Sequence, residues 1–195
     1  MGSREEILAR LRAARPAPRE LPEARRFGNP AADLRARFAQ AVQDAGGRCV
    51  RIGGLDSLPA ALEELAPYRE AHRVASLVPG VTRANVRLED VVDPHDLRDV
   101  DFAVVAGELG IAENGAVWIT DRGMRHRVLP WIAQHVALIV AADCLVNDMH
   151  EAYERLEMGN GFGCFVSGPS KTADIEQALV IGAHSPRSAT SFLVG

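Results

Sequence analysis

Hydroxyl groups and an ammonium group gather near the C-terminus, at a junction where a strand is predicted to pass into a helix. In GFGCFVSGPSKTADIEQALVIGAHSP, residues 161–186, we expect the strand to end at Ser167 and the helix to begin near Thr172. Because the start of a helix carries unpaired N–H groups and about half a positive charge, such a junction suits an anion. The candidate anion-binding residues are Ser167, Gly168, Pro169, Ser170, Lys171 and Thr172.

Two interpretations of this junction stay open. In the first, Ser170 or Thr172 only caps the helix, whose dipole Asp174 and Glu176 already complement. In the second, the junction binds a ligand, because ligands of open α/β sheets gather beyond the carboxyl ends of strands. The segment is no P-loop, since it lacks the G-x-x-x-x-G-K spacing. His184 ends the predicted helix and is either a further ligand-binding residue or a structural histidine favoured by the dipole.

A second candidate is the glutamate segment GELGIAENGAVWITDRG, residues 107–123, where Glu108 and Glu113 interrupt apolar and glycine-rich sequence. A carboxylate in such a place could serve as a nucleophile or general base, and Glu113 is the candidate catalytic residue. The competing interpretation puts Glu113 on an exposed turn, since Asn-Gly between two apolar segments indicates a hairpin. Glycines also let a backbone approach a ligand closely. The ligand-binding candidates of this segment are Gly110, Asn114 and Gly115.

A basic run follows the glutamate segment and consists of Arg122, Arg125, His126 and Arg127. Guanidinium groups pair well with carboxylates, so the run could balance an acidic ligand or an acidic neighbouring protein. The commoner outcome for such a run is a solvated basic turn.

No metal or cofactor is expected in this chain. Cys49, Cys144 and Cys164 stand far apart without a C-x-x-C pair, which argues against an iron–sulfur cluster and favours buried structural thiols. His135 and His184 are isolated from other ligand-type residues, so the sequence supports no zinc site.

The elements that must position these residues alternate between helices and strands. Helical spacing predicts helices over residues 31–45, from Asp56 or Ser57 through Leu65 to a stop at Pro67, and from Asp148 to a stop at Gly159. Apolar runs predict strands at residues 49–52, 73–78, 102–106, 116–120, 136–141, 162–167 and 192–194. Strands apolar on both faces and separated by helices imply a mostly parallel sheet in a three-layer α/β/α sandwich, with an antiparallel element at Asn114-Gly115.

The first thirty residues form a separate N-terminal region. Ser3 and Glu6 make a capping box ahead of a short amphipathic helix that stops by Pro16. Four prolines and several charges between Arg15 and Pro30 indicate an extended arm. We therefore expect a helix and arm over residues 1–30 and one α/β domain over residues 31–195.

Composition excludes several classes of protein. The net charge is −4, which leaves no broad positive field for nucleic acid. No run approaches the roughly 20 apolar residues of a membrane span, and the N-terminus carries charges where a signal peptide needs an apolar run. We expect a cytoplasmic protein that binds neither nucleic acid nor membrane.

Three stretches resemble the LUD domain family: GIAENGAVWI, VLPWIAQHVALIV and VSGPSKTADIEQALVIGAHSP, within roughly residues 100–195. The resemblance implies a fold similar to that of NagB, ribose-phosphate isomerase and the CoA transferases. It also implies a role in oxidising L-lactate to pyruvate beside two partner proteins that carry iron–sulfur clusters. Two positions depart from the family pattern, which usually has threonine at Asn114 and glycine at Ser185.

Three functional hypotheses follow. The first is an accessory or small-molecule-binding component of the iron–sulfur lactate oxidation system, which would take a small anionic ligand. The second is an independent transferase or ligase-type enzyme that uses Glu113 and an anion-binding turn at residues 167–172. The third is a non-catalytic sensor of an organic acid.

Overall fold

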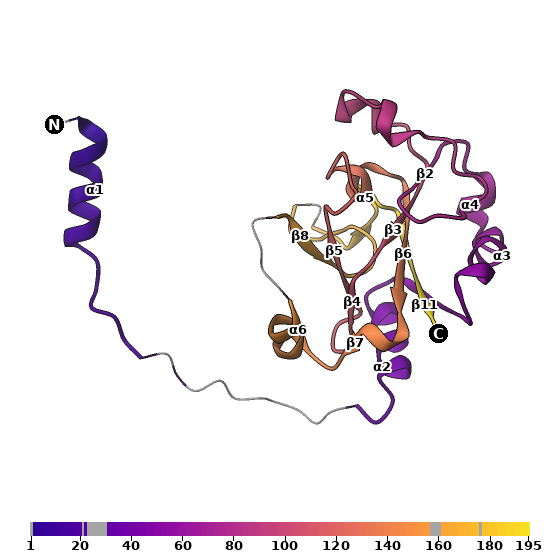
Figure 1. Ribbon diagram of the computed structural model, residues 1–195, viewed down its shortest axis with the longest axis horizontal. Helices are drawn as coiled ribbons and strands as arrows, with labels where there is room; N and C mark the ends of the chain where they lie inside the picture. Colours follow the sequence, from indigo (N-terminus) through magenta and orange to yellow (C-terminus); the bar gives the residue numbers. More distant parts are fainter. Residues whose placement is uncertain (1, 21, 23–30, 157–160, 176) are drawn as a thin grey trace.

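The centre of the molecule is a five-stranded sheet in the order β1-β11-β6-β3-β2, in which all neighbouring strands are parallel. The structure is a computed structural model that describes residues 2–20, 22, 31–156, 161–175 and 177–195 (Figure 1). The strands of the central sheet are Arg48–Ile52 (β1), Val74–Ser76 (β2), Phe102–Ala106 (β3), His135–Ala141 (β6) and Ser188–Val194 (β11). The central strands are buried on both faces, as their continuous apolar sequences predict. The predicted α/β class with a parallel sheet is confirmed.

One face of the central sheet is covered by Leu58–Glu63 (α3) and Ala66–Glu70 (α4), which follow the short turn Leu55–Ser57 (η1). Leu62 and Tyr68 from these helices are fully buried against Phe102 of the sheet. The helix predicted after Ser57 is confirmed as α3, but its predicted stop at Pro67 is wrong, because α3 ends at Glu63 and a second helix, α4, follows. Pro67 lies in the first turn of α4, where a missing N–H leaves no hydrogen bond unmade.

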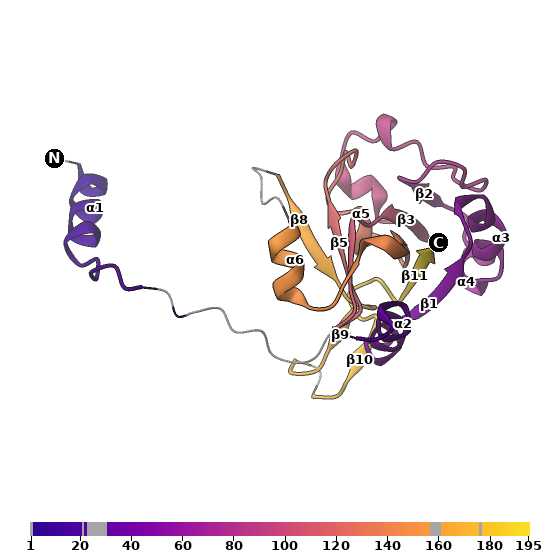
Figure 2. The ribbon, with the colours of Figure 1, turned by 60° about the horizontal axis from the view of Figure 1, so that its bottom comes forward.

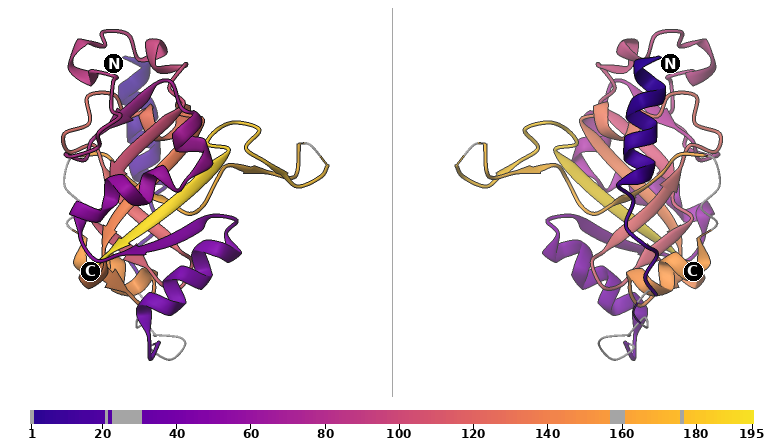
Figure 3. Two further views of the ribbon diagram at one scale, coloured as in Figure 1. Left: turned by 90° about the vertical axis from the view of Figure 1, so that its right-hand side faces the viewer. Right: turned by 90° about the vertical axis from the view of Figure 1, so that its left-hand side faces the viewer.

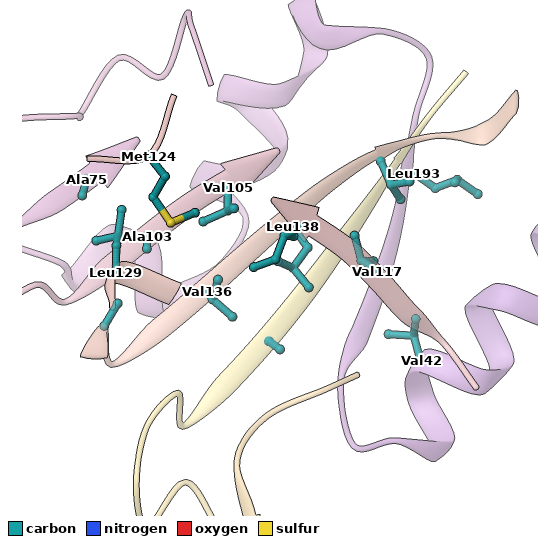
Figure 4. Close-up of a cluster of buried hydrophobic side chains, with 14 of the residues drawn as sticks. Val42, Ala75, Ala103, Val105, Val117, Met124, Leu129, Val136, Leu138 and Leu193 are labelled. Atoms are coloured by element: carbon teal, nitrogen blue, oxygen red, sulfur yellow. The ribbon is translucent and has the colours of Figure 1, made fainter. Parts of the chain in front are cut away.

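The opposite face carries helices together with a second sheet, in the order β7-β4-β5-β8. Its strands are Leu109–Ile111 (β4), Ala116–Thr120 (β5), Leu145–Val146 (β7) and Gly163–Val166 (β8). The helices of this layer are Leu34–Asp44 (α2) and Leu129–Ile132 (α5). Figure 4 shows Leu138 of the central sheet between Val105 and Val117, with Val42 of α2 nearby, in the core that joins the layers. The remaining short turns are Leu88–Asp90 (η2), Pro94–Leu97 (η3) and Ala142–Cys144 (η4).

The helix Met149–Arg155 (α6) packs on the outer face of the second sheet (Figure 2). The predicted N-cap is confirmed, because the Asp148 side chain accepts a hydrogen bond from the Glu151 N–H at 2.8 Å, but the reciprocal bond of the predicted capping box goes to the residue before Asp148. The Glu151 carboxylate in turn accepts one from the Asn147 N–H at 2.9 Å. The helix ends at Arg155, and the predicted stop at Gly159 lies outside the described residues.

The predicted Asn-Gly hairpin is confirmed as the antiparallel pair β4–β5. Gly115 adopts a φ of +68°, and a Cβ there would lie 2.5 Å from the backbone nitrogen of Val42. Glycine is therefore required both by the turn and by the close approach of α2.

The helix predicted from Thr172 is wrong, because the segment forms a second hairpin. Lys171–Thr172 (β9) pairs antiparallel with Val180–Ile181 (β10), and Figure 3 shows this hairpin projecting from the body. A helix gains most of its stability by packing an apolar face, and here Ile175 and Leu179 are 83 % and 67 % exposed. We call residues 171–175 and 177–181 the β9–β10 arm.

The N-terminal helix is Ser3–Ala13 (α1), and none of its residues is buried. Its capping contact lies one residue before the predicted box, since the Gly2 N–H donates to Glu5 Oε2 at 3.2 Å. Glu6 instead pairs with Arg10 at 2.7 Å. Most of the predicted extended arm lies outside the described residues, so the division at residue 30 stays a prediction. Within the described ranges, no helix is long and apolar enough to cross a membrane.

Candidate functional site

A cleft of about 730 Å³ opens between the second sheet and the end of α6, and we call it the α6 cleft. Its lining residues are Glu108, Leu109, Trp118, Thr120, Asp121, Arg122, Arg155, Leu156, Gly161, Phe162 and Gly163. This volume lies within the range of small-molecule sites, and the mixture of apolar floor and charged rim is typical of them.

The floor of the α6 cleft is set by the contact of Trp118 with Gly163 on the neighbouring strand. A Cβ at Gly163 would lie 2.0 Å from the indole, so any side chain there would displace the ring. The Trp118 ring also lies 4.6 Å from that of Phe165 between centroids. A glycine on an edge strand thus lets a large aromatic side chain lie flat across two strands.

The rim carries a carboxylate and a guanidinium side by side. Thr120 Oγ1 donates a hydrogen bond to Glu108 Oε1 at 2.7 Å, and Arg122 Nη1 lies 3.6 Å from the same oxygen. The hairpin register explains the meeting, because the Glu108 N–H donates to the Trp118 carbonyl at 2.9 Å and so aligns Glu108 with the end of β5. The Arg122 side chain is 84 % exposed, which leaves its guanidinium accessible to a ligand.

Asp121 is the most strongly held carboxylate of the rim. Arg127 Nε donates to it at 2.8 Å, and the Phe162 N–H donates at 3.4 Å. Partial desolvation opposes ionisation, but these hydrogen bonds outweigh it and lower the pKa of Asp121 below its ordinary value. The Arg127 guanidinium also lies over the Phe162 ring, 5.3 Å from its centroid.

A second cleft, of about 630 Å³, adjoins the first at the carboxyl end of β2, and we call it the β2 cleft. Its lining residues are Ser76, Leu77, Val86, Leu88, Glu89, Asp121, Gly123, Met124 and Arg125. Asp121 belongs to both clefts. Both clefts therefore lie where strands β2, β3 and β5 end, and for the parallel strands this is the edge at which α/β proteins bind ligands.

The basic run is divided among these features. Arg122 lines the α6 cleft and Arg125 lines the β2 cleft. Arg127 is paired with Asp121, and His126 Nε2 lies 2.9 Å from the Val91 carbonyl oxygen. The run thus lies on a turn with its three arginines exposed, as the commoner interpretation expected, and each of its members also borders a cleft or makes a side-chain contact.

Glu113 lies in the β4–β5 turn, at the opposite end of the hairpin from Glu108. Its exposed carboxylate accepts a hydrogen bond from the Met149 N–H at 3.1 Å, which is the first residue of α6. It therefore satisfies a free N–H group of that helix. Its role as a nucleophile or base stays a prediction.

The two predicted site segments do meet. Ser167 Oγ donates to the Asn114 carbonyl oxygen at 2.8 Å, while the Asn114 side chain accepts from the Ala116 N–H at 3.0 Å. Gly168 adopts a φ of +70°, and a Cβ there would lie 2.4 Å from the Ala45 carbonyl oxygen. The junction lies near the amino ends of β1 and β11, away from both clefts. Because no helix begins at Thr172, the argument for an anion from the helix dipole no longer applies.

The remaining predicted residues are placed as follows. The Ser170 N–H donates to the Pro186 carbonyl at 3.0 Å, which fixes the base of the β9–β10 arm. Gly110 is buried, and a Cβ there would lie 2.5 Å from Leu145, so it serves packing. Pro169 is buried beside Gly46. Lys171 and Thr172 form β9, and His184 lies exposed in the turn after β10. Ligand binding by these residues stays a prediction.

Ser185, one of the two departures from the family pattern, has a φ of +52°. This left-handed region favours glycine. Ser185 therefore holds a strained backbone conformation that a glycine at this position would adopt freely.

The three thiols are partly buried. Burial raises the pKa of Cys49, Cys144 and Cys164, which keeps each thiol protonated at neutral pH. Burial, together with the nearby Arg187, likewise lowers the pKa of His135 and keeps it neutral. In the part of the chain that the structure describes, no three His, Cys, Asp or Glu side chains are grouped to hold a metal ion.

The LUD domain family matches residues 82–194, more than half of the chain. The chain belongs to this family. The matched range of this LUD domain begins after β2 and includes most residues of both clefts and the β9–β10 arm.

Two relatives of this LUD domain illustrate the match to curated proteins. It is 29 % identical over 124 residues to lactate utilization protein C of Shouchella clausii, covering 58 % of this chain and 54 % of that protein. It is 32 % identical over 101 residues to lactate utilization protein C of Geobacillus thermodenitrificans, covering 48 % and 42 %. The chain spans about half the length of the curated relatives it matches.

The fold of this LUD domain is similar to the crystal structure of a DUF162 family protein from Deinococcus radiodurans. The TM-score is 0.65 at 18 % sequence identity, and the match covers 84 % of this chain and 98 % of that one. At this identity the similarity shows the fold.

The sequence interpretation missed the role of Trp118, Thr120 and Asp121 in the α6 cleft. One signal was available, since residues two apart on a strand share a face, which places Trp118 and Thr120 together beside the flagged Glu108.

Proposed function

We propose that this LUD domain is the small-molecule-binding component of a lactate-utilisation system, and that its α6 cleft receives a 2-hydroxy acid such as L-lactate. Membership of the LUD family supports the pathway, together with the relatives named lactate utilization protein C. The observation that carries the ligand class is the pairing of Glu108 with Arg122 on the rim.

The rim groups match the chemistry of a 2-hydroxy acid. The exposed Arg122 guanidinium is suited to bind the carboxylate through two parallel hydrogen bonds. The Glu108 carboxylate can accept a hydrogen bond from the 2-hydroxyl group, and Thr120 holds that carboxylate in place. The apolar surface of Leu109 and Trp118 lies below, where a methyl group would be covered.

In this proposal the oxidation itself takes place on iron–sulfur partner proteins in the cytoplasm. The chain contributes binding and presentation of the acid. Its own cysteines are separated in the sequence, and their thiols are kept protonated by burial.

Isothermal titration with L-lactate and with pyruvate tests the ligand. We expect L-lactate to bind more tightly than pyruvate, which lacks the 2-hydroxyl group, and to lose at least tenfold in affinity in Arg122→Gln, since a hydrogen bond to a charged group contributes about 1.5–3 kcal/mol. Arg125→Gln is the matched control, because it removes the same charge from the β2 cleft. Equal affinities in both variants would contradict the α6 cleft, and a loss only in Arg125→Gln would move the site to the β2 cleft.

Co-purification from cells grown on lactate tests the partners. We expect the chain to recover proteins with iron–sulfur absorption, and growth on lactate to fail when its gene is deleted. Normal growth on lactate after deletion of the gene, together with recovery of no redox protein, would contradict the lactate-utilisation role. Neither outcome would affect the titration result for the α6 cleft.

A further inference from the structure

Large apolar side chains that are exposed to solvent gather on two elements of the described chain. On α1, Ile7 is 56 % exposed and Leu11 is 63 % exposed. On the β9–β10 arm, the exposed residues are Ile175, Leu179, Val180 and Ile181. The other exposed large apolar residues of the described ranges lie singly on separate segments, at Leu55, Val92 and Tyr153. Neither element has its apolar side chains covered by the body of the protein.

The helix needs a surface to pack against. Its eleven residues fall below the roughly 12–15 at which isolated helices become marginally stable in water. Ile7, Leu8 and Leu11 lie on one face, because residues three and four apart are neighbours on a helix. The face is narrow and suits a small apolar patch.

The β9–β10 arm offers a patch of that size. Ile181 belongs to β10 and Leu179 directly precedes this strand, and side chains two residues apart in an extended chain point to the same side, about 7 Å apart. The exposed fractions are 67 % for Leu179 and 52 % for Ile181, against 36 % for the alternate residue Val180. The more exposed side of the arm is therefore the side that carries the pair.

The connecting chain is long enough to bring the two together within one molecule. Residues 14–33 separate α1 from α2, and twenty residues reach about 66 Å when extended. The base of the arm packs on the C-terminal end of α2, where Gly168 meets Ala45. That end lies about 16 Å from Leu34 along the helix, and the arm adds about 17 Å. The linker covers this span with length to spare.

We propose that α1 docks on the β9–β10 arm of its own chain, with Ile7, Leu8 and Leu11 packed on Leu179 and Ile181. Attachment through the linker makes the local concentration of α1 about millimolar, so the intramolecular contact outcompetes a second copy at micromolar protein. The docked helix covers the apolar side of the segment that contains Lys171 and Thr172. The inference does not depend on the ligand of the α6 cleft.

Hydrogen exchange of the full-length chain, read by mass spectrometry, tests the contact from both sides. We expect the amides of residues 3–13 to be protected, and the protection to fall at least tenfold in Leu179→Glu and in Ile181→Glu. Val180→Glu is the matched control, because it adds the same charge at the alternate residue, whose side chain points to the other side of the arm. Reciprocally, Ile7→Glu and Leu11→Glu should expose the amides of the arm, whereas Ala9→Glu, on the opposite face of α1, should not.

Thermal unfolding and light scattering distinguish loss of the contact from unfolding of the body and from dimer formation. The thermal unfolding midpoint of the body should be unchanged in the α1 variants, which shows that the body stays folded. Protection that is independent of protein concentration, in a chain of monomeric mass by light scattering, supports the intramolecular contact. The proposal would be overturned if the α1 amides of the parent chain exchanged as fast as those of an unstructured peptide. It would also be overturned if their protection rose with protein concentration together with a dimeric mass. Equal effects in the control variants would contradict it as well.

Discussion

Ser167 Oγ donates a 2.8 Å hydrogen bond to the backbone carbonyl oxygen of Asn114, and so joins two turns that are 53 residues apart in the sequence. The contact links the end of β8 to the β4–β5 hairpin, beyond the ladder that already pairs β5 with β8. A side-chain hydrogen bond therefore connects the two turns at this end of the second sheet.

Loss of this hydroxyl should weaken the fold measurably. We expect Ser167→Ala to lower the free energy of unfolding by about 1 kcal/mol, the usual contribution of one hydrogen bond. Ser170→Ala is the control, because Ser170 contributes hydrogen bonds through its backbone, which the substitution keeps. Urea unfolding of the two variants measures the difference, and equal stabilities would show that the Ser167 bond contributes nothing.

Gly168 and Gly123 separate the effect of a close approach from that of backbone conformation. Both have φ near +70°, but a Cβ at Gly168 would meet the Ala45 carbonyl oxygen at 2.4 Å, whereas nothing lies within 4 Å at Gly123. We expect Gly123→Ala to cost about 1 kcal/mol from the left-handed conformation alone. Gly168→Ala should cost at least about 2 kcal/mol more, because α2 must shift. Chemical unfolding checks the order, and a smaller loss in Gly168→Ala would contradict it.

Glu113 should act on the stability of α6. Glu113→Ala removes the acceptor of the Met149 N–H, and we expect a loss of about 1 kcal/mol with faster hydrogen exchange at the start of α6. Glu113→Gln keeps an acceptor oxygen and should lose about half as much. If an acyl-transfer activity is found and Glu113 is its nucleophile, the glutamine variant would abolish that activity while keeping most of the stability.

The stability of α6 should also depend on pH through Glu151. Hydrogen bonding from the Asn147 N–H is the main cause that lowers the pKa of Glu151 below 4.5, with Arg155 contributing at 2.7 Å. Because the folded pKa is the lower one, the stabilisation is fully present above the unfolded value and is lost as the pH falls through the folded value.

Glu151→Gln should accordingly be less stable than the parent by about 1 kcal/mol at about pH 7. The gap should shrink as the pH is lowered below about 4.5, since the parent then carries a protonated carboxyl group as well. Unfolding titrations of both proteins at a series of pH values measure this gap, and a constant gap would contradict the assignment.

Local turn and capping chemistry explains what could be predicted of the fold. Asn114-Gly115 predicted a hairpin, in which glycine is required both by the turn conformation and by the close approach of α2. Asp148 with Glu151 predicted the start of α6. The helix predicted from Thr172 was wrong, because its apolar spacing has helical period but the body of the protein does not cover Ile175 and Leu179. Whether such a surface exists depends on tertiary structure, which a local pattern does not contain.

In the candidate site, too, the sequence indicated single residues but not the contacts between them. Glu108 and Arg122 were each singled out from the sequence, but their meeting depends on the register of β4 with β5, in which Leu109 pairs with Trp118. A slip of one residue would turn these side chains to the other face. The pairing of residues across a hairpin becomes visible only when both strands are placed.

Asp121 forms part of the wall between two compartments, and one ion pair with Arg127 holds it there. Because the same carboxylate borders both compartments, any change of its charge alters the electrostatic potential of the two together.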